Sequence, residues 1–298
     1  MKVAVFGAGT MGSGIAQVFA AKGHTALMYA SSTASAQRHK DKLAASLNKK
    51  VAKGKMTQEA ADDIMSRVLV EEFDAAADAD LVIECVAENM AVKKELLGKL
   101  DAICKDETIF ASNTSSISLT SLASATKRPS QVVGMHFFSP VPKMKLCEVI
   151  FGLLTAQDVL EEIQAVGKKM GKTLILSDDK PGFIVNRALL PMLNEACVIV
   201  GLNIGTVEDV DNGMKLGCNH PMGPLELADM IGLDILLNVM TVMEKEIGDK
   251  YRPSMILRKM VTAGFLGRKS GAGFYLYENG KKIGVNPVLT QVHTLSEN

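Results

Sequence analysis

The sequence predicts an α/β protein in which a doubly wound parallel sheet is followed by an all-helical C-terminal domain. Three observations support this prediction. Short apolar runs alternate with helical segments over the first 180 or so residues, which is typical of a parallel sheet. A glycine-rich turn directly follows the first of these runs. Beyond a Pro-Gly break within residues 178–183 the pattern turns helical, so the predicted domains span residues 1–180 and 184–298.

The predicted strands of the first domain follow one another at regular intervals, at residues 3–6, 25–29, 79–86, 108–112 and 132–136. Two further apolar runs are expected as edge strands, at 145–151 and 173–176. The helix after residue 86 is expected to bury one stripe, formed by Val92, Leu96, Leu100 and Ile103. In the second domain, helical segments begin near residues 184, 206, 224 and 254, and a small hairpin is expected at 274–285.

A long polar helical stretch, residues 32–67, is inserted between the second predicted strand and the next one. Gly54 interrupts it, and Thr57 is suited to cap the helix that follows. The stretch is rich in basic residues, among them Lys49, Lys50 and Lys53. From the residues alone, a solvated helical hairpin is the simpler interpretation, and a basic arm that grips a polyphosphate substrate is the functional alternative.

Composition narrows the classes of function. Lys and Arg together number 33, as do Asp and Glu, so no net charge draws the chain to nucleic acid or to a membrane surface. Residues 3–21 are apolar but too rich in glycine for a secretion signal, and no other run reaches the roughly 18 apolar residues of a membrane span. The five cysteines are scattered, and the histidines are not clustered with carboxylates. We therefore expect a cytoplasmic protein with no nucleic-acid partner, no membrane partner and no metal site.

The glycine-rich turn has the spacing Gly-x-Gly-x-x-Gly, from Gly7 through Gly9, Thr10 and Met11 to Gly12. It stands between an apolar strand and a helix, which is the setting of the dinucleotide-binding turn of Rossmann-type folds. The first glycine permits a tight turn, the second lets the backbone approach a pyrophosphate, and the third allows close packing of helix and strand. The N–H groups at the start of the helix attract phosphate. The turn therefore predicts a dinucleotide cofactor.

His136 is the strongest candidate for a catalytic residue. It ends an apolar strand, and the carboxyl ends of strands line the ligand crevice of open α/β sheets. Glu148 interrupts the next apolar run, where an unpaired carboxylate is costly to bury. A His136–Glu148 pair would provide a general base, but a core histidine and an exposed edge-strand glutamate fit the spacing equally well. Ser115 and Asn186 are suited either to bind a carbonyl oxygen or to cap helices.

Taken together, these segments resemble the 3-hydroxyacyl-CoA dehydrogenases, and most closely their bacterial 3-hydroxybutyryl-CoA members. The resemblance covers almost the whole chain and is carried, in order, by GAGTMG at 7–12, ECVAEN at 84–89, ASNTSS at 111–116, MHFF at 135–138, KLCEV at 145–149, NHPMGP at 219–224 and GRKSG at 267–271. It implies reversible oxidation of an L-3-hydroxyacyl-CoA to a 3-ketoacyl-CoA with a nicotinamide cofactor. A four-carbon substrate is the expectation.

The resemblance also implies roles for individual residues. His136 would be the general base, with Glu148 as its orienting partner, and Ser115 and Asn186 would bind the C3 oxygen of the substrate. The cofactor-binding positions would include Glu88, Lys93 and Asn113. The arm at 32–67, with Lys49, Lys50 and Lys53, would bind coenzyme A, and the helical domain would form a homodimer.

Two positions depart from the family pattern. Ala30 stands where the family usually has an acidic residue that accepts the ribose hydroxyls of NAD. NAD remains the expected cofactor, and NADP stays open because Ala30 does not repel a 2′-phosphate. Ser139 replaces the usual asparagine of the substrate site and has a shorter reach. Two alternatives to this family also stay open, namely a related dehydrogenase of free hydroxy acids or sugar acids and a non-catalytic binding protein.

Overall fold

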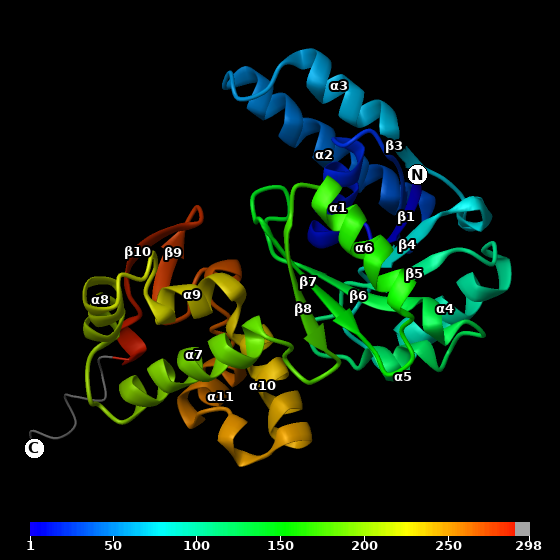
Figure 1. The fold of residues 1–298 in the computed structure, drawn as a ribbon. Coiled ribbons are helices and arrows are strands. Elements are labelled where there is room, and N and C mark those ends of the chain that lie inside the picture. The colour runs from blue at the N-terminus through cyan, green and yellow to red at the C-terminus, as the bar shows by residue number, and fades with distance from the viewer. Residues whose placement is uncertain (290–298) are drawn as a thin grey trace, which may run out of the picture. The chain divides into compact units, whose positions relative to one another are not determined.

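The computed structural model of the protein describes residues 1–289 (Figure 1). The chain forms two compact units, Met1–Phe183 and Ile184–Asn298, and the division falls at the end of the predicted Pro-Gly break. Residues 290–298, which belong to the predicted C-terminal domain, lie outside the described part.

The first unit is built on a mixed sheet whose strands lie in the order β3-β2-β1-β4-β5-β6-β7-β8. The sheet reverses its strand order at β1, which pairs with β2 on one side and β4 on the other. The strands are β1 (Lys2–Phe6), β2 (Thr25–Tyr29), β3 (Val68–Val70), β4 (Leu81–Glu84), β5 (Ile109–Ser112), β6 (Val132–Phe137), β7 (Leu146–Phe151) and β8 (Thr173–Asp178).

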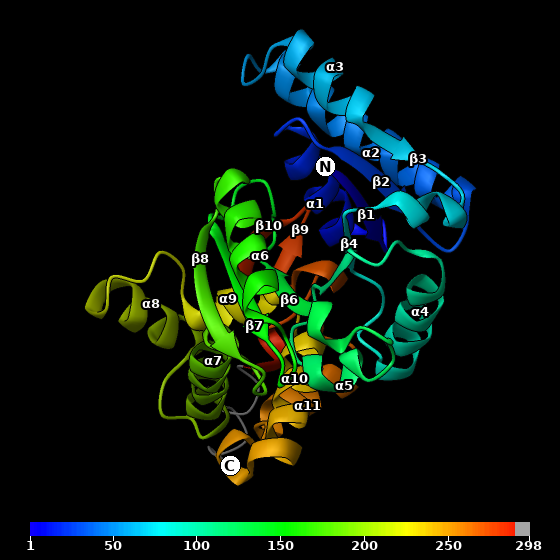
Figure 2. The same ribbon diagram turned by 45° about the vertical axis from the view of Figure 1, so that its right-hand side comes forward.

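Helices cover both faces of this sheet, as Figures 1 and 2 show. Four helices bury their apolar residues in one cluster with the sheet: α1 (Thr10–Ala20), α2 (Thr33–Ala52), α3 (Gln58–Arg67) and α6 (Gln157–Lys169). Two helices pack into a second cluster: α4 (Met90–Ile103) and α5 (Leu119–Ala123). This is the predicted doubly wound arrangement, and it confirms the fold class of the first domain.

The last two strands differ from the prediction. β7 is antiparallel to β6, and it lies inside the sheet because β8 pairs with its other side. The expectation that residues 145–151 form an edge strand was therefore wrong, and β8 alone of the two takes an edge. The sequence shows that a run is apolar but not which strands flank it. β3 was not predicted, because three residues at the end of a polar stretch carry too little pattern.

The predicted apolar stripe of α4 was also wrong in part. Val92 is 44% exposed, whereas the neighbouring Lys93 is 1% exposed. Leu97 and Leu100 are buried, as is Asp101, which forms an ion pair with Arg128. The helix thus turns a face with two charged residues inward, and each is paired.

The polar stretch after β2 forms two helices, α2 and α3, that lie side by side in both views (Figures 1 and 2). Thr57 caps α3 as predicted, since its hydroxyl accepts the N–H of Ala60 at 3.2 Å. Gly54 takes a left-handed φ of 64° between the two helices. α2 buries only Ala36, Leu43 and Leu47, so most of its basic side chains face solvent.

The second unit is helical, with a short hairpin at its end. Its elements are α7 (Val185–Gly201), α8 (Val207–Gly217), α9 (Pro224–Ile231), α10 (Leu233–Ile247), α11 (Met255–Thr262), β9 (Tyr275–Glu278) and β10 (Lys281–Val285). The predicted helix starts and the hairpin agree with these bounds. Within residues 1–289, no helix is both long enough and apolar enough to cross a membrane.

Candidate active site

The glycine-rich turn joins β1 to α1 at the point where the strand order reverses. Gly7 has a φ of 97°, and its N–H donates to the carbonyl oxygen of Tyr29 at 2.9 Å. A Cβ on Gly7 would overlap the Cys85 backbone, and one on Gly12 would overlap the Gly7 carbonyl oxygen. A Cβ on Gly9 would meet no atom of residues 1–289 within 4 Å. The backbone at Gly9 is therefore open to a ligand, as a pyrophosphate site requires.

The start of α1 supplies the electrostatic part of this cradle. Gly9 is the N-cap, and no side chain within the described chain caps the first turn. Thr10 is exposed and Met11 half-buried, and the first turn carries no acidic residue. Unpaired N–H groups and the helix dipole favour an anion at this place. The residues present fit a dinucleotide phosphate.

The residue after β2 occupies the position at which Rossmann-type folds usually have an acidic residue that binds the ribose of the cofactor. Ala30 follows β2, is half-buried and offers no carboxylate. The Ser32 hydroxyl accepts the N–H of Ser35 at 3.2 Å and so caps α2. The usual acidic partner of the ribose hydroxyls is therefore replaced by a neutral methyl group.

His136 and Glu148 face each other across β6 and β7, which pair them directly in register. His136 Nδ1 lies 2.6 Å from Glu148 Oε2, and the two side chains are 8% and 0% exposed. The rings of Phe138 and Phe183 lie against the imidazole, with centroids 4.6 and 5.8 Å from it. A carboxylate can only accept, so Nδ1 donates this hydrogen bond. In the neutral ring, Nε2 is then the nitrogen that can accept a proton.

Residues 113–116, which follow β5, form a loop beside this pair. Asn113 Oδ1 accepts the N–H of Phe137 at 2.9 Å and so ties the loop to the residue after His136. Ser115 donates its N–H to Glu88 Oε1 at 2.9 Å, and its hydroxyl lies 3.3 Å from the same oxygen. Ser115 does not cap a helix, because Ser118 caps α5.

Glu88 and Lys93 belong to one charged cluster with a third residue, Glu84. Lys93 Nζ lies 2.7 Å from Glu84 Oε2 and 3.3 Å from Glu88 Oε2. Burial opposes ionisation of Glu88, but the charge of Lys93 and hydrogen bonds from Thr114, Ser115 and Ser116 outweigh it and lower the pKa of this carboxyl. Glu88 is therefore a carboxylate at neutral pH and accepts every hydrogen bond it makes.

The remaining predicted site residues lie in separate places. Ser139 is exposed and lies two residues beyond the end of β6, ahead of a cis peptide bond to Pro140. Asn186 is half-buried in the first turn of α7, in the second unit. Three basic side chains, of which two are exposed, lie at the end of α2 and just after it: Lys49, Lys50 and Lys53.

Sequence reasoning missed Glu84 and Ser112, the last residues of β4 and β5. Ser112 Oγ donates to Glu84 Oε1 and accepts the N–H of Thr114 at 3.1 Å. A signal was present, since Glu84 is a charged residue within an apolar run. A charged residue at a buried position needs a partner, because an unpaired buried charge is costly. The sequence does not show which residue that partner is.

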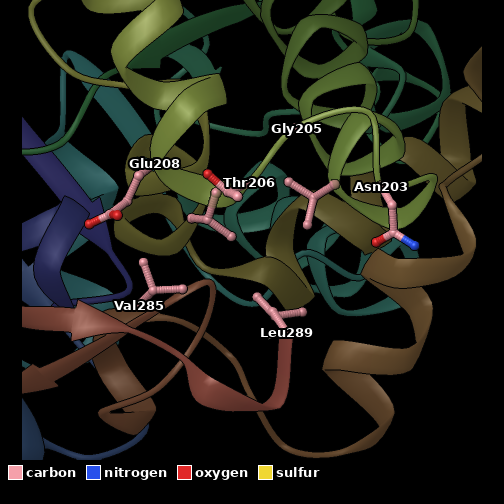
Figure 3. Close-up of a pocket in the computed structure, with 8 residues that line it drawn as sticks. Asn203, Gly205, Thr206, Glu208, Val285 and Leu289 are labelled. Atoms are coloured by element: carbon pink, nitrogen blue, oxygen red, sulfur yellow. The ribbon is translucent and has the colours of Figure 1, made fainter. Parts of the chain in front are cut away.

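Pockets elsewhere do not carry this chemistry. A pocket of about 170 Å³ in the second unit is lined by Val285 and Leu289 on one side and by Asn203, Thr206 and Glu208 on the other (Figure 3). It holds no pair of a base and a carboxylate. Throughout the part of the chain that the structure describes, no three His, Cys, Asp or Glu side chains gather as a metal site would require.

Comparisons with known proteins identify the family of this chain. The family model described as "3-hydroxyacyl-CoA dehydrogenase, NAD binding domain" matches residues 2–180, and the one for the C-terminal domain of the same family matches residues 182–277. The chain is 48% identical to a probable 3-hydroxybutyryl-CoA dehydrogenase of Bacillus subtilis, over 93% of this chain and 97% of that protein. It is 42% identical to the human mitochondrial hydroxyacyl-coenzyme A dehydrogenase, over 93% of this chain and 91% of that one.

Solved structures give the same result. The crystal structure of (S)-3-hydroxybutyryl-CoA dehydrogenase from Ralstonia eutropha superposes with a TM-score of 0.90 at 46% identity, covering 93% of this chain and 99% of that one. These similarities decide against the free-hydroxy-acid and binding-protein alternatives that the sequence left open. A nucleotide cradle, a buried histidine–carboxylate pair and two matched family domains lead to one conclusion: the chain belongs to the 3-hydroxyacyl-CoA dehydrogenase family, whose members are NAD-dependent oxidoreductases.

Proposed function

We propose that this protein interconverts L-3-hydroxybutyryl-CoA and acetoacetyl-CoA with NAD. The observation that carries the proposal is the buried His136–Glu148 pair, 2.6 Å apart at the carboxyl end of β6, in a chain of this family. The four-carbon substrate is supported by the names of the relatives at 46–48% identity, which are 3-hydroxybutyryl-CoA dehydrogenases.

The histidine supplies the proton chemistry of the proposed reaction. In the oxidation direction, Nε2 of His136 takes the proton of the C3 hydroxyl while the C3 hydrogen leaves as hydride and the carbonyl bond forms. NAD, held at the turn from Gly7 to Gly12, would supply the hydride acceptor. Glu148 stabilises the positive imidazolium that results, because its carboxylate holds Nδ1 in a desolvated place. Reduction runs through the same groups in reverse.

Two polar side chains are proposed to bind the C3 oxygen. Ser115 is held on Glu88 beside the histidine strand, and Asn186 opens α7. Ser139, exposed after β6, is proposed as a third polar contact, with less reach than the asparagine that the family has there. Each is a hydrogen-bond donor of the kind that stabilises a developing alkoxide.

The cofactor preference is proposed to be NAD, held at the turn from Gly7 to Gly12. Ala30 removes the usual carboxylate partner of the ribose, and with it the repulsion of a 2′-phosphate. NADPH should therefore support measurable activity, below that of NADH.

The arm of α2 and α3 is proposed to bind the phosphates of coenzyme A. Lys49 and Lys50 lie in the last turn of α2 and Lys53 directly follows it. We further propose that the protein is cytoplasmic and that its helical second domain forms a homodimer.

The test is an assay of acetoacetyl-CoA reduction, run with NADH and with NADPH. His136→Ala is expected to lower kcat by ~10²–10⁴-fold, as for loss of a general base, in a protein that is still folded at the assay temperature. Its melting temperature should fall, because the buried Glu148 loses its partner. His24→Ala, at a half-buried histidine in the turn between α1 and β2, is the matched control and should keep full turnover. An inactive wild type with acetoacetyl-CoA, or near-normal turnover without the His136 imidazole, would refute the proposal.

The basic arm is tested with a triple alanine variant of its three lysines. Each exposed ion pair with a phosphate contributes modestly, so the KM for acetoacetyl-CoA should rise about tenfold while kcat stays near the wild-type value. A variant of two exposed lysines of α6, Lys168→Ala/Lys169→Ala, should leave the KM unchanged. An equal effect of both variants would mean that the arm does not hold the substrate.

A further inference from the structure

Glu84 is a fully buried carboxylate that the proposed mechanism does not use. Both of its oxygens contact Lys93, whose Nζ lies 2.9 Å from Oε1 and 2.7 Å from Oε2. The lysine side chain is itself 1% exposed. A long, flexible side chain is thus held in one place, because leaving either charge alone in this interior would be costly.

Lys93 in turn reaches Glu88. Its Nζ lies 3.3 Å from Glu88 Oε2, while the other oxygen of Glu88 accepts the N–H groups of Ser115 and Ser116 at 2.9 and 3.0 Å. One oxygen therefore faces the lysine and the other faces the loop. The orientation of this carboxylate depends on both sides at once.

A second connection runs from Glu84 to the same loop. Glu84 Oε1 accepts the hydroxyl of Ser112, and Ser112 Oγ accepts the N–H of Thr114. Thr114 also donates its hydroxyl to Glu88 Oε1 at 2.6 Å. The loop is thus fastened by two carboxylates, Glu84 at its start and Glu88 at its end.

This fastening leaves the Ser115 hydroxyl available. At Glu88 Oε1, the Ser115 Oγ contact is 3.3 Å, longer than the contacts of 2.6 to 3.0 Å made there by Thr114, by Ser116 and by the Ser115 N–H. The hydroxyl proton can turn to another acceptor while the backbone bonds keep Oγ in place. A substrate oxygen is such an acceptor.

We propose that Glu84 is a positioning residue for Ser115, acting through the relay Glu84–Lys93–Glu88. The inference rests on the proposed function, in which Ser115 binds the C3 oxygen. Two carboxylates share one ammonium in this relay. Neutralising Glu84 leaves Lys93 to pair with Glu88 alone, which draws that carboxylate away from the loop and moves Ser115 out of register with His136.

The test compares Glu84→Gln, Ser115→Ala and the double variant in acetoacetyl-CoA reduction. Glutamine keeps the size of Glu84 and removes its charge. Displacing a group that orients the substrate by about 1 Å costs ~10–10²-fold in rate. In the wild-type background, Glu84→Gln should therefore lower kcat by that factor. In the Ser115→Ala background the same change should cost less than about twofold, because residues that act as one unit are not additive. The Kd for NADH is measured on the same variants by fluorescence titration, because the family resemblance also places Glu88 and Lys93 at the cofactor.

Two variants guard against a trivial result. Asp101→Asn neutralises a different buried carboxylate, which lies on α4 and pairs with Arg128 at 2.7 Å. This variant should leave kcat unchanged. Glu84→Asp keeps a carboxylate as the partner of the buried Lys93 ammonium but shortens the side chain. It should show an intermediate loss of kcat with the same dependence on Ser115, even where Glu84→Gln does not fold.

The outcomes are distinct. The inference would be overturned if Glu84→Gln lowered kcat by the same factor in the wild type and in Ser115→Ala, or if it weakened only the binding of NADH. The proposed function would still stand. A drop in kcat for Asp101→Asn equal to that of Glu84→Gln would reduce the effect to general destabilisation and overturn it as well. A wild type that does not reduce acetoacetyl-CoA would overturn both the proposed function and the positioning role.

Discussion

Replacing Glu148 by Gln isolates the charge of the buried pair. An amide has nearly the size of the carboxyl, and its oxygen still accepts the Nδ1 proton of His136, so the tautomer of the ring is kept. What the variant loses is the negative charge 2.6 Å from the ring nitrogen, on a side chain that is 0% exposed. The charge matters only when the imidazole carries its second proton. That state follows proton abstraction in the oxidation direction and precedes proton donation in the reduction direction.

The size of the effect follows from the burial and the distance. A hydrogen bond to a charged group contributes about 1.5–3 kcal/mol, and a short bond in a site closed to water lies within this range. With about 1.4 kcal/mol for each factor of ten, the expected loss of kcat is about 10- to 150-fold. KM for acetoacetyl-CoA should change little, because the charge acts on the proton transfer and not on substrate binding.

The assay is steady-state reduction of acetoacetyl-CoA, with thermal melting measured on the same preparations. Glu162→Gln, an exposed carboxylate of α6, is the control for the chemical change and should keep wild-type kcat. Glu148→Gln that melts like the wild type and turns over within about threefold of it would refute the reasoning, since hydrogen bonds to charged groups of this kind are worth more. The carboxylate would then be a structural partner of the imidazole and no more.

Two further predictions concern the turn and the second unit. Gly12→Ala places a Cβ against the Gly7 carbonyl oxygen and should lower the stability by about 1–3 kcal/mol, whereas Gly9→Ala should melt like the wild type and bind NADH more weakly; equal melting temperatures would contradict this. Burial raises the pKa of Asp229 from 3.8 to about 6, although N–H groups of the hairpin oppose the shift. The folded state thus holds this proton more tightly than the unfolded state. That stabilisation is complete below pH 4 and is lost as the pH rises through 6, by about 3 kcal/mol. Urea unfolding of the wild type and of Asp229→Asn should diverge accordingly between pH 4 and pH 7, and a constant difference would contradict the assignment.

Much of the fold could be predicted because every strand of the first unit except β3 contains a recognisable apolar run. The run at 25–29 became β2 with the same bounds, and Thr57 caps the helix it was expected to cap. The sequence did not show which strand lies beside which. β7 therefore looked like an edge strand, although β8 covers its outer side. Neighbour relations depend on tertiary packing, which periodicity does not encode.

For the candidate site too, the sequence predicted the features that depend on local residues and not those that depend on other parts of the structure or on a ligand. The glycine spacing locates the turn, since steric overlap at Gly7 and Gly12 leaves few other residues possible there. His136 was identified by its place at the end of an apolar strand. The roles of His136, Ser115, Asn186 and Ser139 remain predictions, because they depend on a bound substrate.

Glu84 and Glu148 show what decides whether a charge within an apolar run can be interpreted. Both are 0% exposed, and each needs a hydrogen-bonding or charged partner from another element. For Glu148 the partner follows from antiparallel register, because the strand that pairs with β7 places His136 opposite it. For Glu84 the partner is Lys93, one residue away from the stripe that helical periodicity predicted to be buried. The stripe was misassigned because a count of apolar residues alone leaves out Lys93, which is 1% exposed. The same buried carboxylate that makes the sequence look irregular at β4 is the reason that α4 turns its lysine inward, so the two departures have one cause.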